Sequence, residues 1–403
     1  LRFSLGQTGN AASGASLYLG SYASGDNYMD MSAITPSTMQ LNRLKWETTT
    51  EYNTGLDASF LKGKLRFTVD VYQKYIKDLL QKKVKMPTSI GYGNGYEVSY
   101  MNSGKMTNKG WEFRVDAVPF ENRDWRVGFY FNIAHNENKI TEMPDNYTEE
   151  NYTFNNGEYA YRREEGRPMG SFYGYRYKGV CQNKDATYAR DADGNVMKDI
   201  SGNAIVMRNG TATIAPGDAL YEDINHDGVI NQYDIVYLGN SNPRFTGGAG
   251  VNVSYKQFKL SAIFYGRYGQ DVVNSTRLNN ESMRGIDNQS TAVLRRWRNE
   301  GDQTDIPRAL YGEGYNTLGS DRFVEDASYL RLKSLSFNYR LPKKIIQRWG
   351  FSNIDVYVTG YNLFTWTKYT GQDPEVKTEN TYARDSATTP ASIQLVAGFN
   401  LSF

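Results

Sequence analysis

The sequence of 403 residues predicts an all-β fold, a transmembrane antiparallel β-barrel, from three observations. The last segment, 392–403, alternates between an apolar face and a largely polar face, as a strand between lipid and a polar lumen does. The chain combines 32 Tyr, 18 Phe and 6 Trp with a mean hydropathy of −0.64, and it has no apolar run long enough for a helical span. Short turns alternate with long loops, as they do in outer-membrane barrels.

The terminal strand is the clearest single element. Its apolar face carries Ile393, Leu395, Ala397, Phe399, Leu401 and Phe403. Its other face carries Gln394, Val396, Gly398, Asn400 and Ser402. A strand of this kind at the C-terminus, closed by an aromatic residue, resembles the segment by which outer-membrane barrels are recognised for insertion. Taken alone, it also fits an amphipathic strand of a soluble β-protein.

The other strands follow in chain order as a stub and four hairpins. The stub covers 1–6, and the first hairpin runs over 44–61, turns at 62–64 and returns from Leu65 to Tyr72. The remaining hairpins pair 111–120 with 125–133, 245–255 with 258–264, and 328–341 with 354–366. With the terminal strand, the sequence predicts ten strands.

In strand 328–341 we expect one face toward lipid and the other toward the lumen. The lipid set is Leu335, Phe337, Tyr339 and Leu341. The lumen set is Ser336, Asn338 and Arg340.

The connections separate by length. Long polar loops cover 9–43, 83–110, 142–244, 269–327 and 369–391. Loops this long are rare in compact soluble domains. With the C-terminus on the periplasmic side, every short turn falls on that side and every long loop lies outside. A soluble sandwich has no reason to segregate its turns in this way, so the pattern favours the barrel.

Charge and cysteine content restrict the function classes. The net charge of +2, with both signs interspersed, gives no argument for nucleic acid as a partner. A single cysteine, Cys181, excludes an intramolecular disulfide. Because the chain starts inside a strand at Leu1, we expect 1–403 to be the C-terminal part of a barrel domain, with any N-terminal domain outside these residues.

Segment 223–234 has oxygen-bearing side chains at the spacing of a twelve-residue calcium loop, with Gly228 at the turn. We expect one structural Ca²⁺ ion with these ligands: Asp223, Asn225, Asp227, the Val229 carbonyl, Asn231 and Asp234. Asp234 is shorter than the glutamate that EF-hands carry at this position, and the loop resembles the dockerin-type variant. The alternative is an Asx-rich turn that holds no ion.

Aromatic residues gather in the excursion 142–244. The candidates for substrate binding are Tyr159, Tyr161, Tyr173 and Tyr175. Tyrosine offers flat apolar area with a hydroxyl group, which suits sugar rings or peptide backbone. Packing within the loop is the alternative for each of them.

Catalysis has little support in the sequence. The only histidines are His135 and His226, and neither lies in a recognisable nucleophile motif. The acidic stretch 191–195 is expected to be a plain hairpin turn. We therefore expect no enzyme and no catalytic residue.

Many short stretches, in order along the chain, resemble the SusC/RagA family of TonB-dependent outer-membrane transporters. One is Asn-Ser-Gly-Lys-Met-Thr-Asn-Lys-Gly-Trp-Glu over 102–112. The others cover 5–10, 44–48, 55–57, 72–80, 132–138, 170–175, 223–230, 239–245, 294–297, 327–333 and 360–365. Each is weak alone, but their order and spacing make the match specific.

The resemblance implies a multi-pass barrel of about 22 strands in the bacterial outer membrane, plugged by an N-terminal domain. It also implies the partners: TonB through a region outside this chain, a SusD-like surface lipoprotein that closes the mouth as a lid, membrane lipid, and an oligosaccharide or peptide substrate. The function implied is energy-coupled import. Two other classes remain open: an outer-membrane enzyme such as a surface protease on a self-contained barrel, and a soluble glycan-binding β-protein.

Overall fold

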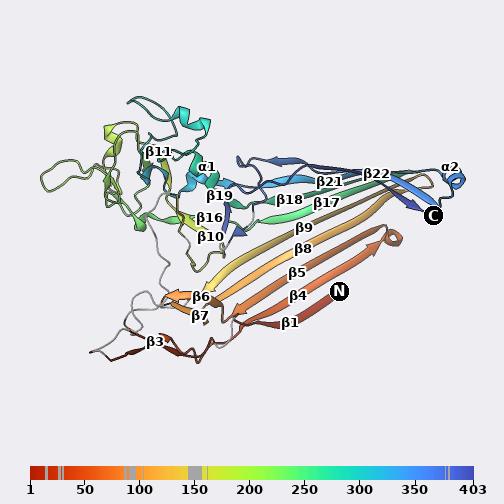
Figure 1. Ribbon diagram of the computed structural model, residues 1–403, viewed down its shortest axis with the longest axis horizontal. Coiled ribbons are helices and arrows are strands. Elements are labelled where there is room, and N and C mark those ends of the chain that lie inside the picture. Colours follow the sequence, from red (N-terminus) through yellow and green to blue (C-terminus); the bar gives the residue numbers. More distant parts are fainter. Residues whose placement is uncertain are drawn as a thin grey trace. The chain divides into compact units, whose positions relative to one another are not determined.

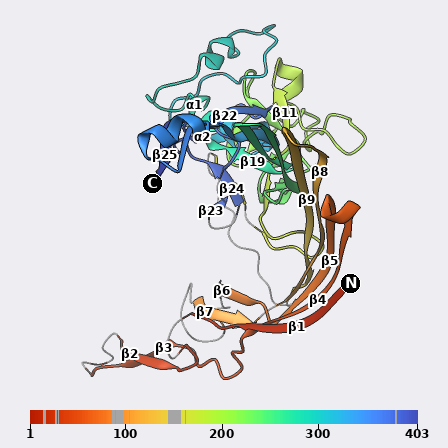
Figure 2. The same ribbon diagram turned by 90° about the vertical axis from the view of Figure 1, so that its right-hand side faces the viewer.

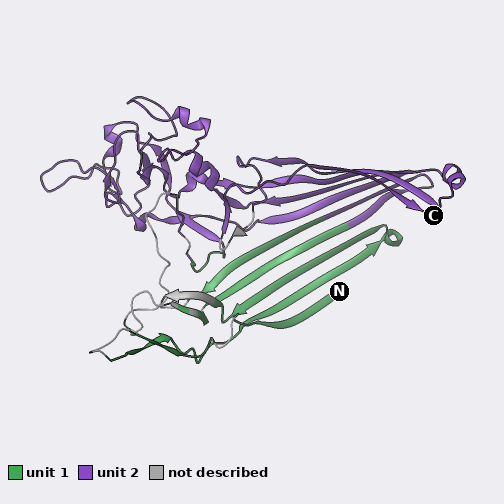
Figure 3. Cartoon of the chain, in the orientation of Figure 1, with its two compact units in different colours: residues 1–115, 132–149, 163–169 green, residues 116–131, 150–162, 170–403 purple. Residues whose placement is uncertain are grey.

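The computed structural model describes residues 1–13, 17–25, 29, 31–85, 89, 97–102, 104–143, 157–160, 162–376, 378–379 and 382–403. It divides into two compact units (Figure 3). Unit 1 comprises 1–115, 132–149 and 163–169, and unit 2 comprises 116–131, 150–162 and 170–403. Among the residues described, no helix is both long and apolar enough to cross a membrane.

Ten strands form one sheet, in the order in which they occur in the chain. They are β1 (Arg2–Asn10), β4 (Glu47–Phe60), β5 (Leu65–Lys77), β8 (Lys105–Glu121), β9 (Trp125–Glu142), β17 (Phe245–Tyr255), β18 (Phe258–Tyr268), β21 (Tyr329–Arg340), β22 (Asn353–Thr367) and β25 (Gln394–Ser402). The pairs β1–β4, β4–β5, β17–β18, β18–β21, β21–β22 and β22–β25 are antiparallel. The ten predicted strands and the all-β fold class are therefore confirmed.

Several predicted strand ends were wrong, because the strands continue into the segments expected as loops. β1 extends to Asn10, β8 begins at Lys105, and β9 reaches Glu142. These extensions are largely polar and carry few apolar residues, such as Ile140, so they lack the apolar alternation that marks a membrane strand. Cross-strand ion pairs support them instead: Lys109 bonds to Glu137 at 2.9 Å, and Lys105 pairs with Glu142.

In unit 1, β1, β4 and β5 lie side by side in both views (Figures 1 and 2). The short turn η1 (Leu61–Gly63) joins β4 to β5 at one end. At the other end lie two hairpins, β2 (Ser21–Ser24) with β3 (Ile34–Thr38), and β6 (Leu80–Lys85) with β7 (Glu97–Asn102). Lys62 at the turn has a φ of 58°, the left-handed conformation that such a tight reversal requires.

Unit 2 shows the same separation of short and long connections. At one end of β21 and β22 the chain turns through α2 (Lys343–Ile346) and η8 (Gln347–Trp349), next to the C-terminus (Figure 1). At the opposite end lie β10, β16, β19 and α1, which belong to the long excursions. The predicted segregation of turn lengths holds within each unit.

The excursions 142–244, 269–327 and 369–391 contain regular structure of their own. Small sheets and single turns form here: β10 (Ser171–Gly174), β11 (Tyr177–Val180), η3 (Lys184–Thr187), β12 (Arg208–Asn209), β13 (Ala212–Thr213), β14 (Ala219–Tyr221), β15 (Val229–Ile230), η4 (Gln232–Asp234), β16 (Val236–Asn240), β19 (Asp271–Asn274), α1 (Ser275–Asn280), η5 (Thr291–Arg295), η6 (Tyr315–Thr317), η7 (Asp321–Phe323), β20 (Val324–Asp326), β23 (Thr378–Glu379) and β24 (Tyr382–Asp385). The elements from β10 to β16 and from β19 to β20 are called the outer module.

The predicted faces of 328–341 agree with the observed register. Phe337 lies opposite Leu260 of β18 and Val358 of β22, and all three side chains are exposed. On the other face the Ser336 hydroxyl lies 2.8 Å from the Thr359 hydroxyl, and the Arg340 guanidinium donates to Asp355 at 2.9 Å. An apolar face toward lipid and a hydrogen-bonded polar face toward the lumen follow from this alternation.

Candidate functional site

The outer module has its own hydrophobic core. Its buried members are Tyr175, Cys181, Ala189, Met207, Ile214, Ala219, Tyr221, Ile230 and Leu318. They come from the excursion 142–244 and, through Leu318, from the excursion 269–327. Because these segments bury a common core, the module is a folded platform at the end of the strands.

The structure buries three of the four predicted tyrosines; Tyr175 belongs to this core, and Tyr159 belongs to a second cluster with Phe172. Tyr159 is 8 % exposed and donates its hydroxyl to the Ser320 carbonyl at 2.7 Å. Tyr173 and Tyr175 are 1 % and 4 % exposed. Tyr161 lies outside the described residues. Packing, the alternative considered from the sequence, accounts for the three buried rings in this conformation, and their role in substrate binding stays a prediction.

Burial sets the acid–base state of these groups. It raises the pKa of the Tyr159 and Tyr175 hydroxyls well above the ordinary range, and it raises the pKa of Tyr177 to about 12. The Arg162 guanidinium lies 5.3 Å from the centre of the Tyr173 ring. Neutral, packed rings of this kind order the loop and perform no proton transfer near neutral pH.

The candidate calcium loop lies at the surface of the outer module. Gly228 has a φ of 80°, and its backbone N–H donates to the Asp223 carboxylate at 2.7 Å. Asp227 accepts the Val229 N–H at 2.8 Å. Asp234 is fully buried and accepts the N–H groups of Ile224 and Asn231, each at 2.8 Å. Backbone N–H groups of the loop therefore donate to carboxylates of the same loop.

The donor set of this loop fits a hard cation. Burial raises the pKa of the Asp234 carboxyl above its usual range, and the Asp223 carboxylate nearby raises it further. A bound cation would favour the ionised form of the Asp234 carboxyl. Among the described residues no three His, Cys, Asp or Glu side chains converge as metal ligands, so Asn225, Asn231 and the Val229 carbonyl would have to complete the shell. The same contacts also satisfy the alternative, an Asx turn.

Sequence reasoning missed the buried ion pairs of the outer module. Glu281 and Arg322 are bonded at 2.8 Å, with side chains 7 % and 5 % exposed. Arg277 bridges Glu281 at 3.1 Å and Glu325 at 3.0 Å. Glu325 in turn accepts the Thr370 backbone N–H at 2.9 Å, which links the module to the last long loop. Arg277 and Glu281 are four positions apart, but Arg322 and Glu325 are distant from their partners in sequence, so no local pattern reveals the network.

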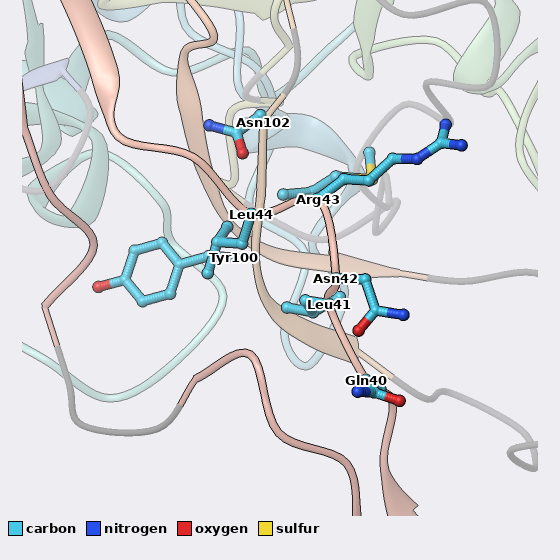
Figure 4. Close-up of a pocket in the computed structure, with 8 residues that line it drawn as sticks. Gln40, Leu41, Asn42, Arg43, Leu44, Tyr100 and Asn102 are labelled. Carbon is cyan, nitrogen blue, oxygen red and sulfur yellow. The ribbon is translucent and has the colours of Figure 1, made fainter.

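Unit 1 contains a separate pocket of about 350 Å³ (Figure 4). The lining residues are Gln40, Leu41, Asn42, Arg43, Leu44, Tyr100, Met101 and Asn102. Tyr100 is already engaged with the Ser13 hydroxyl at 2.7 Å, and Asn102 binds the Lys45 backbone at both amide atoms. The pocket lies between β7 and the segment before β4, and no sequence pattern predicted it.

Comparisons with known proteins agree with this architecture. The model of the family "TonB dependent receptor-like, beta-barrel" matches residues 1–363. TonB-dependent receptor P3 of Formosa agariphila is 32% identical over 84% of this chain and 32% of its own length. TonB-dependent receptor SusC of Bacteroides thetaiotaomicron is 27% identical over 95% of this chain and 34% of its own length. The chain thus spans about a third of the length of these relatives.

Solved structures show the same fold. The RagAB peptide transporter superposes with a TM-score of 0.73 and 26% identity, covering 100% of this chain and 40% of the matched chain. The matched proteins are receptors and transporters. Its members indicate an outer-membrane location. Since the family model covers most of the residues, the chain belongs to the TonB-dependent receptor β-barrel family, and within it resembles the SusC/RagA transporters.

Proposed function

We propose that the receptor containing this chain imports peptides or oligosaccharides across the outer membrane in a TonB-dependent manner. The observation that carries the proposal is the ten-stranded sheet, which follows RagA-type barrels over the whole chain. That solved relative is a peptide transporter, which favours peptides as one substrate class. Contact with TonB would occur through a region outside these residues.

A direct uptake assay tests this function. Cells that express the receptor, its lid and TonB should accumulate labelled oligopeptides or oligosaccharides, and uptake should stop when the proton-motive force is dissipated. A matched strain with an inactive TonB is the control. Uptake that persists in that strain would contradict TonB-dependent import.

We further propose that the outer module is the surface on which a SusD-like lipoprotein lid docks. The module exposes large apolar side chains: Ile200, Tyr233, Ile286, Leu294 and Tyr311. Apolar groups held in water on a folded platform mark an interaction surface. A lid that remains attached while it opens needs an interface of about 2,000 Å² or more.

A structural Ca²⁺ ion in loop 223–234 completes the proposal. Tyr233 lies within this loop and is 69% exposed, so an ordered loop would present it in a fixed position. Asp223, Asn225, Asp227, Asn231, Asp234 and the Val229 carbonyl would hold the ion. Its contribution would be rigidity, because no substrate chemistry is required of it.

A further inference from the structure

β21 changes its face pattern at one residue, Lys333. On the C-terminal side of Lys333, Ser334 lies opposite Ile263, and on its N-terminal side Leu332 lies opposite Phe264. Because Ile263 and Phe264 are consecutive, Lys333 is an extra residue in β21 relative to β18. An extra residue of this kind is a β-bulge, which re-aims the side chains beyond it. On the N-terminal side of Lys333 the even-numbered residues of β21 therefore lie on the lipid face, where Leu330 is 47% exposed.

The bulge brings basic and aromatic side chains together on the lumen face. Tyr329 lies opposite Arg267, and Arg331 opposite Tyr265. The Arg331 guanidinium lies 5.4 Å from the centre of the Tyr329 ring, and the Lys333 ammonium 5.7 Å from the centre of the Tyr265 ring. These five residues are called the basic–aromatic patch.

Two carboxylates of the last long loop cover part of this patch. Glu375 accepts from Arg331 at 2.9 Å and from Lys333 at 2.7 Å, and Asp373 also pairs with Arg331. The Gln270 amide donates to the Pro374 carbonyl at 3.1 Å, which fixes the backbone between the two acids. The loop thus places its own carboxylates where three cations meet.

The loop leaves one cation of the patch without an ion pair and one hydroxyl without a hydrogen bond. Among the described residues no carboxylate lies within ion-pair distance of Arg267, whose Nε donates only to the Tyr265 hydroxyl at 3.2 Å. The Tyr329 hydroxyl is buried without a hydrogen-bond partner in the part of the chain described, and Tyr329 is only 5 % exposed. A buried hydroxyl without a hydrogen-bond partner is energetically unfavourable, so its presence here calls for a functional explanation.

We propose that the basic–aromatic patch is a binding subsite for a substrate carboxylate, and that Glu375 occupies it as an internal competitor until the loop moves. A carboxylate can accept from a guanidinium at two oxygens, and it can take the free Tyr329 hydroxyl as a further donor. The neighbouring rings supply flat apolar area for the rest of the ligand. This inference rests on the proposed import function and names the substrate chemistry.

The proposal predicts opposite effects for two substitutions. Arg267→Gln removes the cation that forms no ion pair with the loop among the described residues, and a ligand carboxylate should bind about 10-fold more weakly. Glu375→Gln weakens the competitor, and the same ligand should bind several-fold more tightly. Lys259→Gln is the matched control, since it removes one charge from the same face of β18, next to Asn338 of β21 and away from the patch.

Tyr329→Phe separates a binding role from a structural one. Because the hydroxyl has no partner, its removal should leave thermal stability unchanged or slightly raised. Carboxylate affinity should nevertheless fall about 5-fold or more. A hydroxyl with no role in binding would leave that affinity unchanged.

Calorimetry with the full-length receptor and its lid in detergent provides the readout. The probes are an oligopeptide with a free C-terminal carboxylate and its C-terminal amide, and an oligouronate and its methyl ester. The pair that shows the charge preference identifies the source of the carboxylate. Equal affinity within both pairs, or no change in Arg267→Gln, would overturn the subsite.

The outcomes for import and for the subsite are distinguishable. If none of the four probes binds or enters cells, the proposed import of peptides and oligosaccharides is wrong. If neutral and acidic probes are both imported equally well by the wild type and by Arg267→Gln, import stands and the subsite is wrong.

Discussion

The Arg308 guanidinium donates two hydrogen bonds to the buried carboxylate of Asp218, from Nε to Oδ1 at 2.7 Å and from Nη2 to Oδ2 at 3.1 Å. The Asp218 side chain is fully buried, while that of Arg308 is 33% exposed. The Asn316 amide adds a third donor at 3.2 Å. The pair fastens excursion 269–327 to excursion 142–244, so we expect it to control the stability of the outer module.

Asp218→Asn should destabilise the outer module by about 2–4 kcal/mol, because it removes the charge that satisfies Arg308 at a buried position. The change should appear as a lower urea midpoint for unfolding of the outer module, with unfolding measured by hydrogen exchange. Asp193→Asn, at an exposed hairpin tip, is the control and should shift the midpoint little. Equal midpoints for Asp218→Asn and the wild type would show that the pair does not fasten the module.

Cys181 should resist alkylation in the folded receptor. Burial, with a smaller contribution from the Asp218 carboxylate, raises the pKa of this thiol to about 11, so the reactive thiolate is about 100-fold scarcer at pH 8 than for an ordinary thiol. Protection should persist as pH rises and should end only as pH approaches the raised pKa or as the module unfolds. Iodoacetamide labelling followed by mass spectrometry measures this. Rapid labelling of the native protein would contradict the burial.

Phe337→Arg should destabilise membrane insertion, by about 2–4 kcal/mol if the site is near the bilayer midplane and by less near an interface. Phe337 is 45% exposed on the apolar face, beside Leu260 and Val358. Heat-modifiable gel mobility after refolding into lipid vesicles reports the folded fraction. Asn338→Arg, one residue along on the polar face, should be tolerated, and equal losses in both variants would contradict the assigned faces.

Calcium should raise the melting temperature of the outer module, and a chelator should lower it. The expected coordination distances are about 2.3–2.6 Å from oxygen to metal. Asp223→Ala should abolish the response, because this carboxylate is the first ligand of the loop. Asp191→Ala, in the hairpin turn at 191–195, is the control and should retain it. A melting temperature that ignores both calcium and chelator would identify loop 223–234 as an Asx turn.

Tyr233→Asp should weaken the complex with the lid, since it places a charge at an exposed aromatic position of the outer module. Purification of the receptor from native membranes in mild detergent should then recover less than the stoichiometric lipoprotein. Tyr233→Phe keeps the apolar area and should retain the lid. Full recovery with the aspartate variant would place the lid contact elsewhere.

The sequence predicted the sheet well because the membrane imposes a strict alternation on each strand. Strand 245–255 and its return from Phe258 were found with the right turn, since the apolar face is uninterrupted across both. Lys105 and Glu142 were assigned to loops, because strands that rise out of the lipid no longer need an apolar face. The same limit explains why the small sheets of the outer module were missed.

The candidate site was predicted less completely than the sheet. The calcium-loop pattern is local, so its residues could be named, and the occupancy of the loop stays a prediction. The tyrosines were found, but their burial depends on partners such as Ser320, which is far away in the chain. Arg331 and Glu375 were not singled out at all, because 44 positions separate them and only the folded loop brings them together.

The extra residue at Lys333 also bears on how this strand is compared between relatives. Two proteins could be identical at all the remaining positions of β21 and differ only by a deletion at this one. On the C-terminal side of this position they would present the same side chains to lipid. On its N-terminal side the residues that face a ligand in one protein would face lipid in the other. A gap placed one position away in an alignment would therefore exchange the substrate-facing and membrane-facing sets, and conservation scores averaged over the strand would conceal the difference.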